Sequence, residues 1–188
     1  MELVSKAIIF ATKAHDGMRR KQSDVPYIFH PLEAAVIVST MTSDQEVISA
    51  AVLHDVVEDA GITLDEISKE FGERVRFLVA SETENKRETL PSDLTWKIRK
   101  EESLEYLKNT KDTNVLMVWL GDKLANMRSI YESWKTNGNE MWKQFNQKDT
   151  NEHTWYYESI AKYTSALQEH RAWKEYNELV KIVFSKGE

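Results

Sequence analysis

Two helix-start patterns with a helix-stop residue between them constrain how the first half of this chain can fold. Ser43-x-x-Glu46 and Thr63-x-x-Glu66 are capping-box patterns, in which a hydroxyl and a carboxylate satisfy free backbone N–H groups of a first helical turn. Gly61 lies between them, and a glycine in the left-handed conformation often ends a helix. The sequence therefore predicts one helix that ends at Gly61 and a short one that ends near Phe71–Gly72.

Apolar residues recur at helical spacing over most of the remaining chain, and no segment sustains the alternation that is typical of a strand. Leu3–Ala11 has an apolar face, and Pro31 suits the first turn of a second helix. The polar segment Glu82–Thr95 contains Pro91 and is predicted to be a loop. Further helices are expected over residues 94–107, 115–134, 154–168 and 172–184, with a break at 137–139. We therefore predict an all-α fold.

Length and composition favour one folded domain. A chain of 188 residues with 41% hydrophobic residues, six Trp and seven Tyr can bury a sizeable core. The chain has no cysteine, so metal ligands must be His, Asp, Glu or Asn, which argues against a structural zinc site. A net charge of −6 without a long basic stripe argues against nucleic acid as a partner.

The N-terminal segment does not read as a targeting signal. Lysines interrupt Leu3–Ala14 at helical spacing, which fits an amphipathic helix better than a signal peptide. No stretch approaches the length of a transmembrane span, so we expect no membrane partner. Cytoplasmic residence is the expectation that follows.

Four groups that can bind metal or move protons follow the apolar run 51–53. His54 and Asp55 precede Glu58 and Asp59, and residues four apart share one face of a helix. Carboxylates packed this closely repel one another, and a divalent cation would reconcile them. An ordinary exposed acidic helix end is the alternative.

Two further segments carry the same kind of residue. His30 lies in Pro26-Tyr-Ile-Phe-His-Pro31, where the two prolines hold it at the mouth of a helix. Asp122 follows an apolar run, where a buried carboxylate requires a partner or a metal. A capping role for His30 and a salt bridge for Asp122 are the alternatives.

The order His … His-Asp … Asp resembles the ligand pattern of the HD phosphohydrolase superfamily. The stretches RRKQSDVPYIFHPLEAA, AAVLHDVVEDAGITLDEISKEFGERVRFLV and WLGDKLANMRS resemble the hydrolase domain of the RelA/SpoT alarmone enzymes, and the chain length resembles the stand-alone small alarmone hydrolases. The motifs are clear from Ala11 to Ser129 and looser beyond. The resemblance implies a compact single-domain helical bundle over residues 1–188, with motifs in 11–130, C-terminal helices in 138–186 and a metal site between helices.

The resemblance also implies roles for individual residues. The metal ligands would be His30, His54, Asp55 and Asp122, and the metal would be Mn²⁺, which is typical of the family. The spacing itself does not separate Mn²⁺ from Fe²⁺, Co²⁺ or Zn²⁺. Glu58 would orient or deprotonate the attacking water, and Asp59 would support it. The substrate contacts would be Arg20 and Lys21 at the nucleobase, Asn126 near the base and ribose, Lys97, Arg99 and Lys100 at distal phosphates, and Tyr156 at a phosphate. Solvated basic side chains and ordinary helix contacts are the alternatives for these last residues.

The implied function is that of a metal-dependent guanosine-3′,5′-bis(diphosphate) 3′-pyrophosphohydrolase. It would act on the small-molecule nucleotide (p)ppGpp or (p)ppApp and release GDP or GTP, or the adenine equivalent, with pyrophosphate. Two alternatives are another nucleotide phosphatase on this scaffold, acting on NADPH, a (d)NTP or a nucleoside monophosphate, and a non-catalytic alarmone-binding protein. The segment Ser81–Lys86 departs from the bifunctional relatives and leaves the preferred base open. A homo-oligomer, regulation and neutralisation of a toxic synthetase also stay open.

Overall fold

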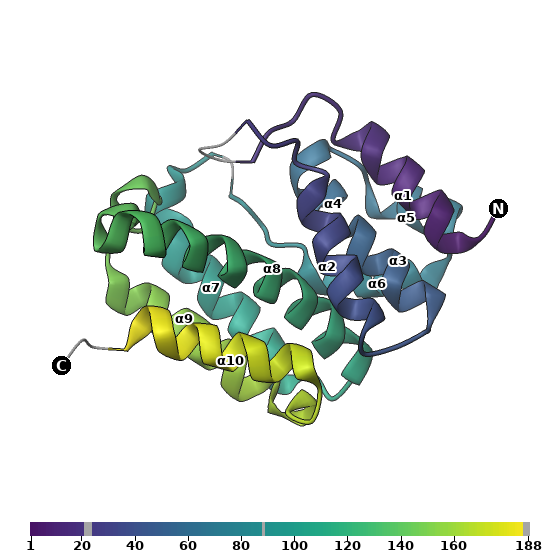
Figure 1. Cartoon of the computed structure of the whole chain (residues 1–188). Helices are drawn as coiled ribbons and strands as arrows, with labels where there is room; N and C mark the ends of the chain where they lie inside the picture. The colour runs from purple at the N-terminus through teal and green to yellow at the C-terminus, as the bar shows by residue number, and fades with distance from the viewer. Residues whose placement is uncertain (21–23, 88, 186–188) are drawn as a thin grey trace.

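The computed structural model describes residues 1–20, 24–87 and 89–185, and in these ranges every regular element is helical (Figure 1). An isolated bridge pairs Arg19 with Pro26. The all-α prediction is confirmed. The elements are α1 (Leu3–Ala14), α2 (Phe29–Ser39), α3 (Gln45–Leu53), α4 (Val56–Ala60), α5 (Leu64–Phe71), α6 (Glu73–Glu82), α7 (Ser92–Asn109), α8 (Thr113–Asn137), η1 (Gly138–Gln144), α9 (Thr150–Tyr163), η2 (Ser165–Leu167) and α10 (Arg171–Phe184).

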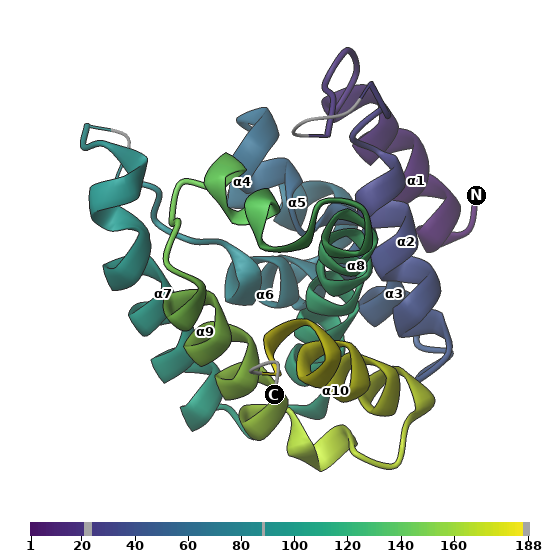
Figure 2. The same ribbon diagram turned by 60° about the vertical axis from the view of Figure 1, so that its left-hand side comes forward.

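Helix α8 runs through the middle of the molecule, with α2, α3, α6 and α10 packed around it (Figure 2). It is apolar on several faces, and Trp119, Leu120, Leu124 and Met127 are fully buried. A helix with apolar side chains on several faces belongs in a core. Helices α7 and α9 pack together on one side of it, and α1 covers α3 on the other.

Helices α2 and α8 approach each other closely at Gly121. A Cβ built on Gly121 would stand 2.6 Å from Cγ2 of Val38 and 2.9 Å from the backbone oxygen of Ala34. Interiors are close-packed, so a side chain at this position would force the two helices apart. The missing side chain therefore sets the spacing between α2 and α8.

The local signals for α4 and α5 hold. Thr63 and Glu66 form the predicted capping box, and α5 ends at Phe71. Gly61 ends α4 in the left-handed conformation, with φ 69°. The prediction for Ser43 is wrong, because Asp44 is the N-cap of α3 and accepts a hydrogen bond from the backbone N–H of Glu46. Asp is as good a cap as Ser, and it stands one residue later.

The prediction of one uninterrupted helix through His54 and Asp55 is also wrong. Helix α3 ends at Leu53 and α4 begins at Val56. The His54 ring bonds through Nδ1 to the carbonyl of Ala51, which would accept the N–H of Asp55 if the helix continued. A side chain thus replaces the backbone partner, and the chain turns at this pair.

Other helix boundaries differ from the predicted ones by a few residues, and α6 and the 3-10 helix η1 were not predicted. Helix α6 follows Gly72 directly and takes in Glu82, while α7 begins at Ser92, so the predicted loop is shorter than expected. The predicted helix 154–168 begins four residues earlier and gives way to the 3-10 turn η2. Within the described part of the chain, no helix is both long enough and apolar enough to span a membrane.

Candidate metal and catalytic site

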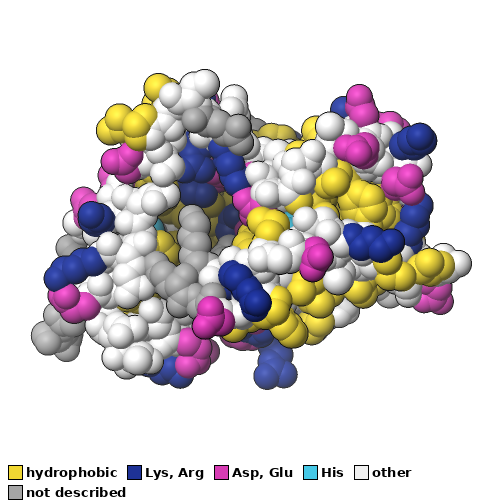
Figure 3. Space-filling model, turned by 90° about the horizontal axis from the view of Figure 1, so that it is seen from above, with side chains coloured by type: hydrophobic (Ala, Val, Ile, Leu, Met, Phe, Trp, Pro, Cys, Tyr) yellow, Lys and Arg dark blue, Asp and Glu magenta, His cyan; other side chains and the backbone are white. Residues whose placement is uncertain are grey.

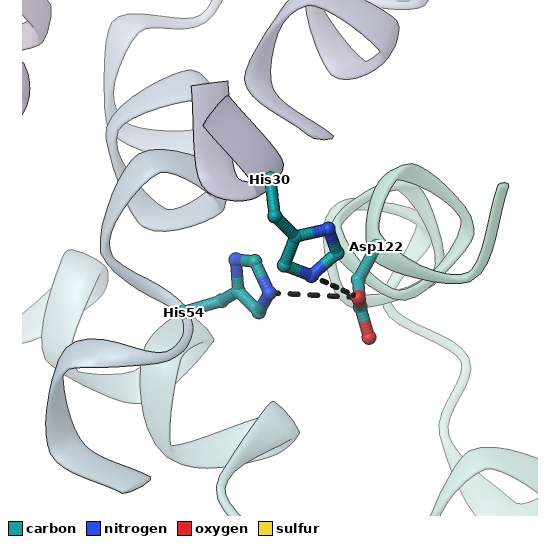
Figure 4. Close-up of side chains that lie close together, drawn as sticks. All are labelled: His30, His54 and Asp122. Carbon is teal, nitrogen blue, oxygen red and sulfur yellow. Dashed lines mark ion pairs between the residues drawn. The ribbon is translucent and has the colours of Figure 1, made fainter. Parts of the chain in front are cut away.

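Three separate parts of the fold bring the four predicted metal ligands close to one another. His30 stands in the first turn of α2, His54 and Asp55 occupy the junction of α3 and α4, and Asp122 lies in α8. Nε2 of His30 is 3.0 Å from Oδ1 of Asp122, and Nε2 of His54 is 3.5 Å from the same oxygen (Figure 4). The ligand atoms of these three buried residues lie within 4.8 Å of one another, a spacing that could hold a metal ion.

Asp55 lies beside this group but is not one of the three residues whose ligand atoms all fall within 4.8 Å of one another. Its Oδ2 is 3.1 Å from Nε2 of His54 and 3.5 Å from Nε2 of His30. Each imidazole therefore faces both carboxylates through Nε2. The turn between α3 and α4 makes this possible, because adjacent residues of a straight helix point about 100° apart.

The tautomer of His54 fits a metal ligand. A carbonyl can only accept, so the 2.8 Å contact with Ala51 requires Nδ1 of His54 to carry a hydrogen. The neutral ring then presents a lone pair at Nε2, which is buried. Metal-bound histidines typically fix their second nitrogen by such a bond. The cluster is therefore suited to a divalent cation with nitrogen and oxygen ligands.

The charges in the cluster bind one another strongly when no cation is present. Burial works to lower the pKa of His54, but the neighbouring carboxylates of Asp55 and Asp122 raise it well above 6.5. Burial works to raise the pKa of Asp55, yet His54 and His30 bring it well below its usual range. The pKa of Asp122 is lowered likewise, against its burial, first by Lys123 and then by the two histidines. Both carboxyls are thus ionised at neutral pH.

Glu58 and Asp59 lie next to the cluster on α4. Burial raises the pKa of the Glu58 carboxyl, and the charges of Glu84 and Asp55 raise it further. A carboxylate with a raised pKa is a better proton acceptor near neutral pH. Asp59 accepts a hydrogen bond from the hydroxyl of Tyr27 at 2.8 Å.

Tyr27 connects this acidic pair to the candidate ligands. Its hydroxyl lies 2.7 Å from Oδ2 of Asp55 and 2.8 Å from Oδ2 of Asp59. Burial raises the pKa of Tyr27 and the two carboxylates raise it more, so the phenol keeps its proton. One hydroxyl proton is therefore shared between a candidate ligand and a candidate catalytic residue.

Asn126 and Lys123 hold Asp122 from two sides. Nδ2 of Asn126 donates to Oδ1 of Asp122 at 2.6 Å, and Lys123 forms an ion pair with Oδ2. Arg20 lies 3.5 Å from Oδ1 of Asn126 and 3.3 Å from the hydroxyl of Ser129. Asp122, Asn126 and Ser129 thus lie along one face of α8, and Arg20 contacts the last two of them.

Behind Asp122, the buried Lys123 also lies 3.3 Å from Oε2 of Glu82. Burial raises the pKa of the Glu82 carboxyl to about 8, with Lys123 opposing the rise. A buried ammonium group requires close polar partners. Lys123 has them in Asp122 and Glu82.

The predicted phosphate contacts on α7 and α9 are already engaged with acidic or aromatic groups. Lys97 pairs with Glu152, while Arg99 and Lys100 both pair with Glu84. Tyr156 is buried, with Nζ of Lys100 4.9 Å from its ring centroid. Lys21, predicted at the nucleobase, lies outside the described residues.

Several side chains of the site were not assigned a role from sequence. Tyr27 stands inside the motif that contains His30, Lys123 directly follows Asp122, and Glu84 and Lys86 belong to the segment that departs from the bifunctional relatives. Position in those motifs was the only signal available for them. Tertiary contacts bring these four side chains to the site, and a sequence pattern does not show such contacts.

The face that is seen in Figure 3 is hollowed in its middle, where Lys and Arg side chains gather beside acidic ones. This arrangement suits an anionic ligand next to a cation site. A separate depression of about 730 Å³ lies between α9 and the end of α10 and is lined by residues such as Trp155 and Phe184. It contains none of the four candidate ligands, so the chemistry does not belong there.

Comparisons with known proteins give the setting for this site. The sequence profile of the HD domain matches residues 7–151. The crystal structure of lmo0812 from Listeria monocytogenes EGD-e superposes with a TM-score of 0.73 at 31% identity and covers 84% of this chain and 99% of that one. A structure described as a metazoan ortholog of SpoT that hydrolyzes ppGpp superposes with a TM-score of 0.76 at 22% identity, over 97% and 96% of the two chains. The second likeness is one of fold.

Longer proteins share the same region. The GTP pyrophosphokinase rsh of Brucella ovis is 37% identical over 128 residues, which are 68% of this chain and 17% of that protein. The guanosine-3′,5′-bis(diphosphate) 3′-pyrophosphohydrolase of Aquifex aeolicus is 35% identical over 130 residues, which are 69% and 18% of the two chains. The match therefore spans less than a fifth of the length of these relatives.

Proposed function

Because this chain belongs to the HD-domain family, we propose that it is a metal-dependent phosphohydrolase that removes the 3′-pyrophosphate from (p)ppGpp or (p)ppApp. The resemblance to the RelA/SpoT enzymes is confirmed by the relatives that share the domain. The observation that carries the proposal is the convergence of His30, His54, Asp55 and Asp122 with Glu58 beside them.

The names of the relatives refer to opposite reactions, and the residues of this chain favour one of them. One relative is named for GTP pyrophosphate transfer and the other for pyrophosphate hydrolysis. Two imidazoles and two carboxylates can hold a cation, and the nearby Glu58 carboxylate can accept a proton. Together these groups are suited to activating a water molecule that attacks a phosphate ester. Hydrolysis is therefore the activity that we assign to this domain.

We propose Mn²⁺ as the cation, held by His30, His54, Asp55 and Asp122. A mixed set of imidazole and carboxylate donors is compatible with Mn²⁺, and the resemblance favours it over other divalent ions. A bound cation supplies Lewis acidity toward a phosphate oxygen and lowers the pKa of water.

The other residues would bind and orient. Glu58 accepts the proton of the attacking water at its carboxylate, and Asp59, which accepts a hydrogen bond from Tyr27, supports it. Asn126 and Arg20 present donors and an acceptor next to Asp122, where a nucleoside edge could be read. Lys97 and Tyr156 are proposed to meet the distal phosphates.

The test is turnover by the purified chain. With Mn²⁺ and ppGpp, nucleotide chromatography should show GDP and pyrophosphate, and EDTA should abolish their formation. A panel with ppApp, NADPH, dGTP and GMP measures preference, and we expect the 3′-pyrophosphate esters to exceed the others by at least about 100-fold in kcat/KM. A preferred substrate without a 3′-pyrophosphate would favour a different phosphatase, and tight ppGpp binding without turnover would favour a binding protein.

A further inference from the structure

The carboxylate of Glu84, in the segment between α6 and α7, bonds to three side chains of α7. Its side chain is 7% exposed, and it accepts from Arg99 at 2.9 Å, from Lys100 at 2.7 Å and from the hydroxyl of Ser103 at 3.1 Å. A nearly buried carboxylate with three donors is held in one position. Glu84 thus fastens its segment to α7.

The same segment reaches the acidic pair on α4 with its other groups. The backbone N–H of Glu84 donates to Oε2 of Glu58 at 3.3 Å. Nζ of Lys86 donates to the backbone oxygen of Glu58 at 2.9 Å, lies 3.6 Å from its Oε1, and forms an ion pair with Asp59. Both side-chain oxygens of Glu58 therefore face the segment.

These contacts form one continuous connection. Helix α7 holds the Glu84 carboxylate through its cations, and the backbone N–H of that same residue holds Glu58. Only one residue separates Glu84 from Lys86, so fixing the first restricts where the ammonium of the second can lie. The hydroxyl of Tyr27 bounds Asp59 on the opposite side.

We propose that Glu84 is a positioning residue: its carboxylate fastens the Thr83–Lys86 segment to α7, and the fastened segment holds Glu58 and Asp59 in place beside the candidate ligands. This inference rests on the proposed function for its catalytic meaning. It gives Arg99 and Lys100 the role of anchors. The competing reading has them as phosphate ligands that Glu84 occupies only until substrate arrives.

The two readings predict opposite kinetic results for Glu84→Gln. If the Glu84 carboxylate is an anchor, losing it misplaces Glu58. In that case kcat should fall about 10- to 100-fold while KM stays within about threefold. If Glu84 instead competed with substrate, the variant would lower KM and leave kcat intact, which would overturn the proposal. Glu175→Gln is the matched control, because it breaks a different ion pair, with Arg128, that joins α10 to α8; its kinetics should equal those of the wild type.

A double-mutant cycle separates positioning from general damage. In a Glu58→Gln background, adding Glu84→Gln should lower kcat by less than about twofold further, because there is no base left to position. A full additional loss would mean that Glu84 acts elsewhere. Circular dichroism and thermal melting of each variant identify any that fails to fold.

Hydrogen exchange tests the same connection without turnover. Brief labelling should show faster exchange of the 83–86 amides in Glu84→Gln than in the wild type or in Glu175→Gln. Unchanged exchange would overturn the positioning role even in an active enzyme. Should the wild type hydrolyse no alarmone, the proposed function fails, and this measurement still decides whether Glu84 fixes the segment.

Discussion

The α-carbon of Gly121 faces the backbone carbonyl oxygen of Ala34 so closely that a Cβ would stand 2.9 Å from that oxygen. Gly121 immediately precedes Asp122, and Ala34 is one turn beyond His30 on α2. The close approach of the two backbones therefore lets the His30 ring reach the Asp122 carboxylate at 3.0 Å. Helix packing and site geometry depend on the same missing side chain.

Gly121→Ala should destabilise the fold and loosen the site together. The added methyl group would overlap Val38 and Ala34, and overpacking of this kind costs about 1–3 kcal/mol in the free energy of unfolding. Urea denaturation measures the loss, and a Mn²⁺ titration should show weaker binding. Glu132→Ala, on an exposed position of the same helix, is the control; equal stability of both variants would contradict the packing argument.

Asp122→Asn should remove most of the affinity for Mn²⁺. The amide keeps the size of the side chain but loses the charge that faces both histidines. We expect at least a 100-fold rise in the Kd, about 3 kcal/mol, measured by electron paramagnetic resonance of free Mn²⁺. A variant that kept both metal and turnover would remove Asp122 from the ligand set.

Glu58→Gln should separate chemistry from metal binding. Loss of a general base typically lowers kcat by about 10²–10⁴. The Glu58 carboxylate bonds to the backbone N–H of Glu84 and not to the two histidines, so Mn²⁺ affinity should stay within about threefold. Single-turnover hydrolysis and the resonance titration measure the two quantities. A drop in affinity that accounts for the whole loss of rate would make Glu58 a ligand.

Tyr27→Phe removes the hydroxyl that Asp55 and Asp59 share. Mutating a residue that hydrogen-bonds to a metal ligand typically lowers metal affinity or activity by about 10- to 100-fold, so we expect a fall of about that size in kcat/KM. The ring is retained, so thermal stability should change little. Tyr163→Phe, remote from the site, serves as the control. Unaltered kinetics in Tyr27→Phe would show that the shared proton has no catalytic consequence.

Affinity for Mn²⁺ should increase with pH. The pKa of His54 lies well above 6.5 in the metal-free protein, so the ring carries a proton that a cation must displace. Asp55 and Asp122 have lowered pKa values and are already ionised. The Kd should therefore fall about tenfold per pH unit below the pKa of His54 and level off above it. Titrations between pH 6 and 9 test this, and a flat profile would contradict it.

The fold class and most helices could be predicted because their signals are local. Capping at Thr63 and the stop at Gly61 depend on residues within one turn. Helix α6 was missed because it follows α5 with only Gly72 between them, and that glycine was assigned to the end of α5 alone. The turn at His54 could not be predicted, since a side-chain bond to Ala51 produces it.

The candidate ligands could be found because motif order names them, whereas their surroundings could not. Tyr27 and Lys86 meet Asp59 from segments on either side of it in sequence, and no spacing rule links the three. The cations on α7 were expected to be available to phosphate, yet Arg99 and Lys100 are paired with Glu84. Pairing across the fold is a property of tertiary contacts, and a helical pattern displays only which residues share a face.

The candidate ligands come from α2, the α3–α4 junction and α8, and this has a consequence for how stable the protein is against degradation. An ion bound by all of them would link distant segments of the chain. Because the denatured chain has no comparable site, the bound ion would stabilise the folded state. When the ion is scarce, a larger fraction of the protein would be unfolded and open to proteases, and the proposed activity would be lost as well. Abundance in the cell would follow metal supply, so a starved cell would hold fewer copies.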